Sequence, residues 1–589
     1  GHSLLAVQVM SRVREAFGVE LTVKALFESP TVRQLGERVA SAPRRTRGPA
    51  LERLPSSDPS SMGPQPLSYA QRRLWFLDQL EGGSATYNIP MALRLEGALD
   101  VEALERALAT VLERHESLRT RVETIDGEPM QVVEPLGPWR LQVEEVASAE
   151  WDRRLSSFSA EVFDLGRGPM LRAVLLRESA TLHALGVNLH HIAGDGWSLG
   201  VLGRELTTLY GAYRRGASSP LSPLPVQYGD YARWQRAWLS GGELDRQLGY
   251  WKEKLGGAPP LLELPTDRPR PAEQSYRGKL HLFRVPAEVS DGLKRATRAE
   301  GATLYMTLLA GFKALLSWYS GQGEIVVGTP TANRDRVELE GLVGFFVNTL
   351  VLRDEVRWEE SFAQLVRRVR ETVLDAQSHQ DVPFEQLVEV LQPERRLSHS
   401  PLFQVMFDMQ GGSASGAGGL ELPEVSVSEL GESEHRVAKF DLSLSLGEDG
   451  TGLQGGLEYN EDLFDAETVE RLSRHYVRLL AQVSADPGRR LDTLQLLEEE
   501  EWSRQRGWDG PVRAASWRGG LAAAFGAQAQ RTPEADALVC GEERLSYAEL
   551  ESRANRLAHA LLERGVGAEV RVGVCLRRRT ELAVTLLAI

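Results

Sequence analysis

Residues 189–198 read Leu189-His190-His191-Ile192-Ala193-Gly194-Asp195-Gly196-Trp197-Ser198, and the fold is built around this stretch. Every second residue leading into it follows one pattern: Leu185, Val187, Leu189 and His191. A period of two is typical of a β-strand, whose successive side chains point to opposite faces. The alternation therefore predicts that His191 points to one face of a sheet and that His190 points to the other, together with Asn188.

An amphipathic helix is predicted directly after the stretch, at 199–214. Its apolar residues recur at helical spacing: Leu199, Leu202, Leu206, Leu209 and Tyr213. Serine is a favoured N-cap residue, so we expect Ser198 to cap this helix. The turn Gly194-Asp195-Gly196 would then connect the strand to the helix.

The histidine pair and Asp195 point to chemistry at this turn. An imidazole, a carboxylate four residues later and turn amides form a plausible acid–base site. A structural histidine with a capping aspartate is the alternative for His191 and Asp195. A zinc site is disfavoured, because neighbouring histidines on a strand point in opposite directions and cannot share one metal ion. We therefore predict no metal here.

Composition limits the partners that the chain can have. The net charge of −14 disfavours a general phosphate-binding surface, so we expect no nucleic acid partner. No apolar run reaches the ~18 residues that span a bilayer, so we expect no membrane partner. Cys540 and Cys575 are the only cysteines, which fits a cytoplasmic protein without disulfides. The chain starts without Met and ends inside an apolar run at 582–589, which predicts a piece of a longer polypeptide.

The whole stretch resembles the active-site motif of the condensation domains of nonribosomal peptide synthetases, His-His-x-x-x-Asp-Gly-Trp-Ser. Other motifs of that family occur in its order along the chain: SYAQRRLWF (68–76), RHESLRT (114–120), YGDYARW (228–234), GTPTANR (328–334), GFFVNT (344–349), HQDVPFE (379–385) and RRLSHSPLF (395–403). The resemblance implies an α/β condensation domain at 67–500, with two lobes that resemble chloramphenicol acetyltransferase, at about 67–240 and 241–500. Between the lobes it implies a tunnel that a donor carrier and an acceptor carrier enter from opposite sides.

The resemblance also implies roles for single residues. His191 is the candidate catalytic residue, His190 a structural neighbour on the other face, and the Gly196 N–H a candidate oxyanion donor. The family's aspartate matching Asp195 is structural and pairs with the arginine matching Arg334, so an Asp195–Arg334 ion pair is expected. Trp197 belongs to the same structural support. The second lobe has no such motif of its own, so one active site is expected.

Other parts of the condensation-like region have simpler interpretations. A structural polar cluster is favoured over catalysis for His115 and Glu116, at the end of an amphipathic helix beginning near Val101. The motif at 228–234 is expected to be aromatic packing. Further elements are predicted as follows: a buried helix at 303–319, a strand at 324–330, an amphipathic helix at 359–377 and a mobile loop at 411–419.

Residues 1–40 are predicted to be helical and resemble part of a peptidyl carrier domain. Leu5, Val9, Val13 and Phe17 form a ridge at helical spacing, which Gly18 ends. The sequence Gly1-His2-Ser3-Leu4-Leu5 is similar to the attachment motif of carriers, whose serine bears 4'-phosphopantetheine. Ser3 at a helix N-terminus suits a phosphodiester, although a plain N-cap is the alternative. The carrier's first helix is absent from this sequence.

The remaining segments are two linkers and a second partial domain. Residues 41–66 and 501–520 are rich in linker-type residues. Residues 521–589 resemble the start of an adenylation (AMP-binding) domain, with a predicted helix around Ala554 to Leu562 and a strand at 570–576. The family's phosphate loop lies beyond Ile589, so ATP and Mg²⁺ are expected only for a full-length adenylation domain and not for this chain.

Together these features predict a segment of a nonribosomal peptide synthetase, in which an amide forms between a donor thioester and the α-amine of an acceptor aminoacyl thioester. The expected partners are the upstream and downstream carriers, their thioesters and a phosphopantetheinyl transferase. Two alternatives stay open: an acyltransferase of the chloramphenicol acetyltransferase type that uses a soluble thioester, and a non-catalytic module that docks carriers. The amino acids joined and the donor configuration, L or D, are not determined.

Overall fold

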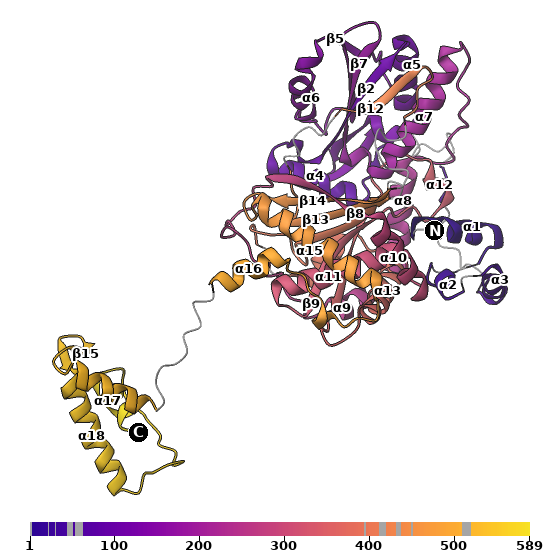
Figure 1. Cartoon of the computed structure of the whole chain (residues 1–589). Coiled ribbons are helices and arrows are strands. Elements are labelled where there is room, and N and C mark those ends of the chain that lie inside the picture. The colour runs from indigo at the N-terminus through magenta and orange to yellow at the C-terminus, as the bar shows by residue number, and fades with distance from the viewer. Residues whose placement is uncertain are drawn as a thin grey trace. The chain divides into compact units, whose positions relative to one another are not determined.

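The computed structural model describes residues 3–589 except 20, 22, 30, 44–50, 54–62, 394–395, 411–419, 431–436, 449–450 and 509–519. The chain divides into two compact units, Gly1–Leu496 and Leu497–Ile589. The first unit contains two lobes, and each lobe is a β-sheet with helices packed on it (Figure 1). Within the described residues, no helix combines the length and the apolar character needed to cross a membrane.

The first lobe is a five-stranded sheet in the order β12-β2-β7-β6-β5. Its strands are β2 (Asn88–Gly97), β5 (Gln142–Glu145), β6 (Leu171–Arg177), β7 (Leu182–His190) and β12 (Val425–Glu429). Helices α5 (Val101–Arg114) and α7 (Gly196–Arg214) cover one face, and α6 (Trp151–Ser159) covers the other. Leu185 packs in the α5–α7 core and Ala184 in the α6 core, as the period of a strand requires.

The second lobe is a six-stranded sheet in the order β10-β9-β11-β13-β14-β8. Its strands are β8 (Gly278–Pro286), β9 (Glu324–Thr331), β10 (Asn348–Glu355), β11 (Val405–Gln410), β13 (Leu442–Glu448) and β14 (Gly452–Asn460). Its core is built with helices α10 (Ala287–Ala299), α11 (Leu304–Ser320), α13 (Phe362–Gln377) and α15 (Ala466–Ala485). The predicted helix at 303–319, strand at 324–330 and helix at 359–377 are confirmed by α11, β9 and α13, each within a few residues.

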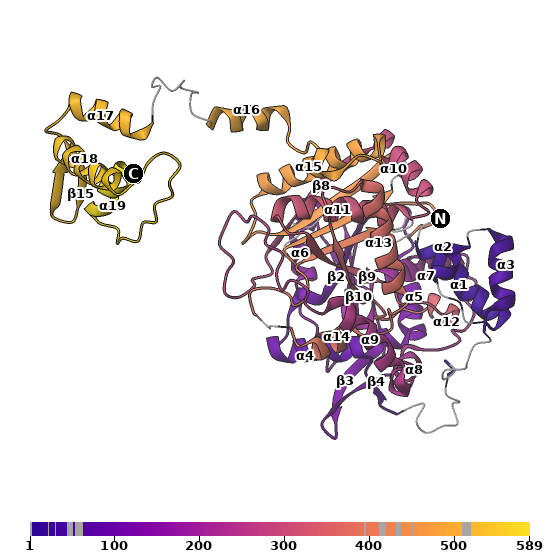
Figure 2. The same cartoon turned by 90° about the horizontal axis from the view of Figure 1, so that it is seen from below.

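One strand joins the two lobes. β12 lies between β11 and β13 in the sequence, yet it pairs antiparallel with β2 of the first lobe, as the orange arrow among the indigo strands shows (Figure 1). Five further helices lie around the junction: α4 (Tyr69–Glu81), α8 (Tyr228–Trp238), α9 (Leu244–Leu255), α12 (Val337–Glu340) and α14 (Phe384–Leu391). α14 packs against α4, which brings the two lobes into contact at residues far apart in sequence (Figure 2). The predicted two-lobed α/β fold is therefore confirmed.

The predicted linkers contain regular structure where the chain is described. Gln65–Pro66 at the end of 41–66 forms β1, which pairs with β4 (Glu128–Val133), and β4 pairs with β3 (Thr120–Ile125). Pairing with an available strand edge explains why this proline-containing segment is ordered. Residues 499–508 form the polar helix α16 (Glu499–Trp508), which has acidic residues in its first turn and Arg506 in its last. The predicted loop at 411–419 lies outside the described residues.

The N-terminal segment forms three helices, α1 (Ser3–Phe17), α2 (Val23–Glu28) and α3 (Val32–Ser41), as predicted. Gly18 has φ +62° directly after α1, a conformation that glycine adopts at low cost. Thr31 caps α3 through its side chain and forms a capping box with Gln34. Met10 is the fully buried centre of this small bundle, whereas Val9 and Phe17 of the predicted ridge are exposed.

The second unit contains the β-hairpin β15 (Asp536–Cys540) and β16 (Glu543–Ser546) with helices α17 (Leu521–Arg531), α18 (Tyr547–Glu563) and α19 (Thr580–Ala588). α18 confirms the predicted helix, with Leu550 and Ala554 buried. The predicted strand at 570–576 is wrong: these residues form no strand, and Val570, Val574 and Leu576 are exposed. Alternating apolar residues form a strand only when a neighbour pairs their backbone groups, and no described strand does so here.

Candidate active site

The turn after β7 differs from the predicted geometry. β7 ends at His190, and one 3₁₀ turn, His191–Ala193, leads through Gly194 into α7. The N-cap of α7 is Asp195, whose carboxylate accepts the Ser198 N–H at 2.9 Å. The predicted cap at Ser198 is therefore wrong. Because α7 begins at Gly196, Ser198 is already the third residue of the helix, and Asp195 occupies the N-cap position whose side chain accepts a free amide of the first turn. The helix begins at Gly196, and strand alternation does not govern His191.

His190 is buried at the end of β7. Its ring lies edge-on to Phe163, with 5.7 Å between ring centroids. Its Nδ1 accepts a hydrogen bond from the Ile192 N–H at 3.1 Å, so in the neutral ring the proton is on Nε2. Burial, with the charges of His191 and Lys439, lowers the pKa of His190 to about 3. His190 is therefore a neutral side chain that caps the 3₁₀ turn.

His191 has the opposite tautomer. Its Nδ1 lies 3.1 Å from the Gly194 carbonyl, which can only accept, so Nδ1 carries the proton and Nε2 keeps a free lone pair. Its ring lies edge-on to Phe345 of the second lobe, with 5.1 Å between centroids. Burial, helped by the charge of Lys439 and opposed by Asp195, lowers the pKa of His191 to about 4. The imidazole is therefore neutral near pH 7 and able to accept a proton at Nε2.

Asp195 is occupied by structural bonds on every side. One oxygen accepts the Ser198 amide and hydroxyl and lies 3.1 Å from Arg334 Nη2, and the other accepts the Phe346 N–H at 3.0 Å. The side chains of Asp195 and Arg334 are only 4% and 1% exposed. The predicted Asp195–Arg334 ion pair is confirmed. Because a buried pair needs further hydrogen bonds to offset its desolvation, this network braces the turn.

Arg334 makes the pair rigid. Its Nη1 donates to the carbonyls of Leu339 and Leu342 at 2.7 and 2.6 Å. The guanidinium also stacks over Phe346, 4.0 Å from the ring centroid, and lies 5.7 Å from that of Trp197. Trp197 Nε1 donates to the Glu340 carbonyl at 3.0 Å. The two residues predicted as structural support thus hold the start of α7 against the segment around α12.

A segment of the second lobe, Val343-Gly344-Phe345-Phe346, is held by side chains of the first lobe; we call it the strap. Ser117 Oγ donates to the Val343 carbonyl, Ser198 Oγ accepts the Gly344 N–H, and Tyr228 OH donates to the Phe345 carbonyl at 2.6 Å. A Cβ on Gly344 would lie 2.1 Å from the Tyr228 ring, so this close approach requires glycine. The strap fixes Phe345 beside His191.

His115 and Tyr228 have the structural roles that were favoured. His115 Nδ1 accepts the Val343 N–H at 3.3 Å, and its Nε2 lies 2.9 Å from Glu205. Tyr228 packs with Tyr231 and Phe346 in a small aromatic core. Both residues support the strap.

Sequence reasoning did not place Phe345 or Lys439 at the site. Phe345 lies in the matched motif GFFVNT, which was the one signal that could have found it, but it reaches His191 only through tertiary packing. Lys439 lies just before β13, and its Nζ is 4.9 Å from the centroid of the Tyr87 ring. Tyr87 directly precedes Asn88, which pairs with His190 in the sheet. Burial lowers the pKa of Lys439, and its charge contributes to the low pKa of both histidines.

The remaining predicted site residues lie at helix starts. Gly196 is the first residue of α7, where backbone amides have no intrahelical acceptor, so its N–H suits an incoming oxygen. Ser3 is the first residue of α1, and the placement of its side chain is outside what the structure describes. The roles predicted for Ser3, Gly196 and the two histidines stay predictions.

Sequence models of three families match the chain. The model described as condensation domain matches residues 62–504, the model described as phosphopantetheine attachment site matches 1–39, and the model described as AMP-binding enzyme matches 525–589. The condensation match alone covers most of the chain.

Curated relatives extend over the whole chain. A linear gramicidin synthase chain of Brevibacillus parabrevis is 44% identical over 599 residues, covering 100% of this chain and 12% of the relative. Malpinin synthetase of Mortierella alpina is 40% identical over 598 residues, with 8% of the relative covered. A dimodular nonribosomal peptide synthase of Bacillus subtilis is 42% identical over 605 residues, with 25% covered. The chain therefore spans a quarter or less of these relatives.

Solved structures agree with the fold. The X-domain from teicoplanin biosynthesis is 33% identical, with a TM-score of 0.69 over 76% of this chain and 100% of the solved chain. A second solved structure, of a complex of that X-domain and OxyB, is 32% identical, with a TM-score of 0.69 and coverage of 77% and 99%. The first condensation domain of the CDA synthetase, at 23% identity and a TM-score of 0.63 over 74% and 99%, supports the fold alone. With the matched motifs in place around His191, the chain belongs to the condensation-domain family of nonribosomal peptide synthetases.

Proposed function

We propose that the first unit forms an amide bond between an acyl or peptidyl thioester on an upstream carrier and the α-amine of an aminoacyl thioester on a downstream carrier. The amine nitrogen attacks the thioester carbonyl, the tetrahedral intermediate collapses, and the thiolate leaves. The amine proton passes to His191 Nε2 and then to the leaving sulfur, so the histidine is regenerated. The observation that carries this proposal is the tautomer of His191, since its Nδ1–H bond to Gly194 leaves Nε2 as a proton acceptor.

The other residues of the site hold His191 in position or stabilise the charge that develops on the thioester oxygen. Asp195 does not serve as the orienting partner of His191 in this proposal, because its oxygens are taken by Ser198, Phe346 and Arg334. The Gly196 N–H is the candidate donor to the oxyanion that forms on the thioester carbonyl. The reaction itself makes a modest demand, because near neutral pH roughly a tenth to a third of an α-amine with a pKa of ~7.7–8.0 is unprotonated. Alignment of two tethered substrates is the larger task.

A docking module is the second candidate function. The solved complex of a related X-domain with OxyB supports it, since that domain binds another protein. An acyltransferase with a soluble thioester is the third possibility. Single-turnover assays with two preloaded carriers separate them: amide formation supports the proposal, carrier binding without product supports docking, and equal rates with a soluble donor thioester support the acyltransferase.

The pH dependence of the reaction is expected to follow the acceptor amine and not His191. His191, with a pKa of about 4, is already neutral above about pH 5, with His190, Asp195 and Lys439 as the charged or titratable groups that affect it. The rate should rise about tenfold per pH unit below ~7 and level off above ~8.5, as the α-amine loses its proton. Two acceptors whose amines differ in basicity test this. The inflection should move with the amine, and a fixed inflection near ~6.5, the ordinary pKa of histidine, for both acceptors would contradict the prediction.

Ser3 is expected to carry 4'-phosphopantetheine when the chain is extended upstream by the rest of the carrier domain. The family match at 1–39 supports the attachment domain, and the start of α1 offers free backbone amides to a phosphodiester. Intact-mass measurement after treatment with a phosphopantetheinyl transferase and coenzyme A should show one added group. Ser3→Ala is the control and should stay unmodified; a group that survives this change would place the attachment elsewhere.

Two further parts of the proposal concern the cofactors of the adenylation domain and the cellular compartment. ATP and Mg²⁺ would act only in the complete adenylation domain, whose opening segment is matched at 525–589. Catalysis in the cytoplasm is an expectation that rests on the low cysteine content.

A further inference from the structure

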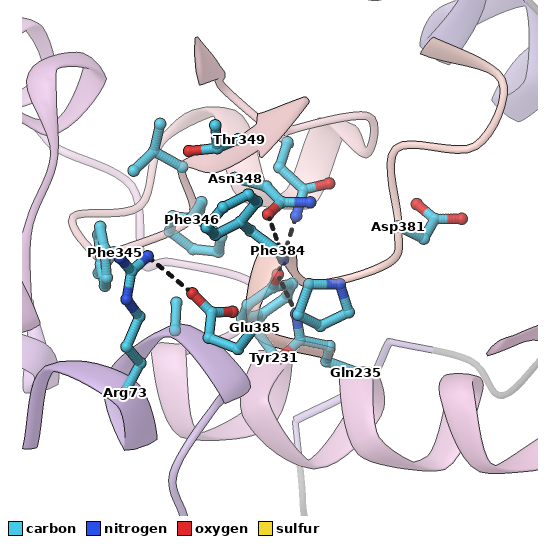
Figure 3. Close-up of a pocket in the computed structure, with 14 residues that line it drawn as sticks. Arg73, Tyr231, Gln235, Phe345, Phe346, Asn348, Thr349, Asp381, Phe384 and Glu385 are labelled. Atoms are coloured by element: carbon cyan, nitrogen blue, oxygen red, sulfur yellow. Dashed lines mark hydrogen bonds and ion pairs between the residues drawn. The ribbon is translucent and has the colours of Figure 1, made fainter. Parts of the chain in front are cut away.

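A pocket lies at the junction of the lobes, and Phe345 is one of the residues that line it. Its lining comes from α4, α8, the strap and the start of α14, with Arg73, Tyr231, Phe345, Asp381 and Phe384 among the side chains (Figure 3). Arg73 Nη1 donates to Glu385 Oε1 at 2.9 Å across the lobes, which keeps this guanidinium occupied. The lining therefore presents one ion pair, Arg73–Glu385, and one further acidic side chain, Asp381, whose carboxylate accepts a hydrogen bond from Gln247 Nε2 at 2.8 Å. With one acidic group in excess, the lining suits a group that carries an amine better than an anionic group.

Phe345 stands between this pocket and the catalytic histidine. One side of its ring contacts His191, with 5.1 Å between centroids, and the residue also lines the pocket and is partly exposed there. Because the same ring contacts His191 and lines the pocket, its size bears on how closely a group in the pocket can approach His191.

The backbone that carries this ring is held in place from both sides. The carbonyl of Phe345 accepts the Tyr228 hydroxyl, and the amides of its two neighbours bond Ser198 Oγ and Asp195 Oδ2 at 3.1 and 3.0 Å. Burial raises the pKa of Tyr228, so its hydroxyl stays protonated as a donor. Gly344 is pressed against the Tyr228 ring, which removes the remaining freedom of the backbone. A ring carried on a backbone fixed in this way limits the size of a neighbouring group more sharply than a ring on a free loop would.

We infer that Phe345 is a specificity-determining residue, whose ring limits the size of the acceptor aminoacyl group that can present its amine to His191. This inference rests on the proposed function for the assignment of the acceptor. It assigns no role in proton transfer to Phe345.

The test uses the full chain with one loaded donor carrier and soluble aminoacyl-pantetheine thioesters of alanine, leucine and tryptophan as acceptors. In Phe345→Ala the ratio of the tryptophan rate to the alanine rate should rise at least tenfold, since one methylene in an apolar pocket is worth about 10–200-fold in selectivity. Phe345→Leu should move the ratio in the same direction by a smaller factor, and it carries the test if the alanine variant does not fold. When the acceptor is kept constant and the size of the donor is varied, neither variant should change the ratio of the rates measured with the different donors.

Phe163→Leu is the matched control. This variant replaces the phenylalanine that contacts His190, in the same way that Phe345→Leu replaces the one that contacts His191. Phe163 does not line the pocket. In Phe163→Leu, the ratio of the tryptophan rate to the alanine rate should equal that of the unchanged chain. Equal changes for all three acceptors in the Phe345 variants, or a change that depends on the donor, would overturn the inference.

Binding separates this inference from the proposed reaction. Aminoacyl-pantetheine amides, which cannot transfer their acyl group, are titrated calorimetrically into both forms. We compare the ratio of the affinity for the tryptophan amide to the affinity for the alanine amide. This ratio should be at least tenfold higher in Phe345→Ala than in the unchanged chain. Size-selective binding without amide formation would refute the proposed reaction but support the role of Phe345. Amide formation with unchanged selectivity in the Phe345 variants would refute the role of Phe345 alone.

Discussion

Replacing His191 with alanine is expected to lower the single-turnover rate of amide formation by about 10²–10⁴-fold, with the fold and the loading of the carriers unchanged. The reason is the tautomer: Nδ1–H is used by the Gly194 carbonyl, and Nε2 is the acceptor for the amine proton. The loss should be at the lower end of this range if His191 mainly positions the amine, because the amine needs little activation.

His190→Ala is the matched comparison, since it removes the same side chain one residue earlier. His190 Nδ1 accepts the Ile192 N–H, and its ring packs on Phe163. Its loss leaves a buried amide without a partner, which costs about 1–3 kcal/mol, so stability should fall before the rate does. Thermal melts run beside single-turnover assays measure both effects. Equal rate losses in two equally stable variants would refute the assignment, and a larger rate loss in His190→Ala would exchange the two roles.

Asp195→Ala is expected to lower the free energy of unfolding of the first unit by about 3–5 kcal/mol, the second large effect. The substitution leaves the Arg334 guanidinium buried without its carboxylate and frees the amides of Ser198 and Phe346. Activity should fall with it, because the turn that carries His191 and the strap that carries Phe345 lose their common partner.

Urea denaturation of the single and double variants checks this. Arg334→Met in the Asp195→Ala background should recover part of the loss, because an apolar side chain then replaces an unpaired buried charge. Arg334→Met alone should be destabilising, since it isolates the carboxylate. If Asp195→Ala abolished the reaction with an unchanged unfolding curve, Asp195 would act in the chemistry and the structural assignment would be wrong.

The sequence was sufficient for the elements whose local pattern matches their final environment. The amphipathic helix predicted to begin near Val101 is α5, which buries Leu104, Leu108 and Val111. The motif order predicted the two lobes, and the arginine of GTPTANR predicted the partner of Asp195. Local pattern failed where an element depends on a neighbour: β1 formed within a predicted linker because β4 offers an edge, and 570–576 formed no strand because none of the described strands pairs with it.

What the sequence by itself determined is the family, the histidine motif and the amphipathic faces that bury the core. What only the tertiary structure decided is the state of the site: the opposite tautomers of His190 and His191, the cap at Asp195, the strap beneath Tyr228 and the ring of Phe345 beside His191. The physical reason is distance along the chain. Asp195 and Phe346 are 151 residues apart and Arg334 is 139 residues from Asp195, yet each bond depends on the other elements being packed first. A hydrogen-bond partner, a buried charge and the wall of a pocket are properties of that packing, which no local period encodes.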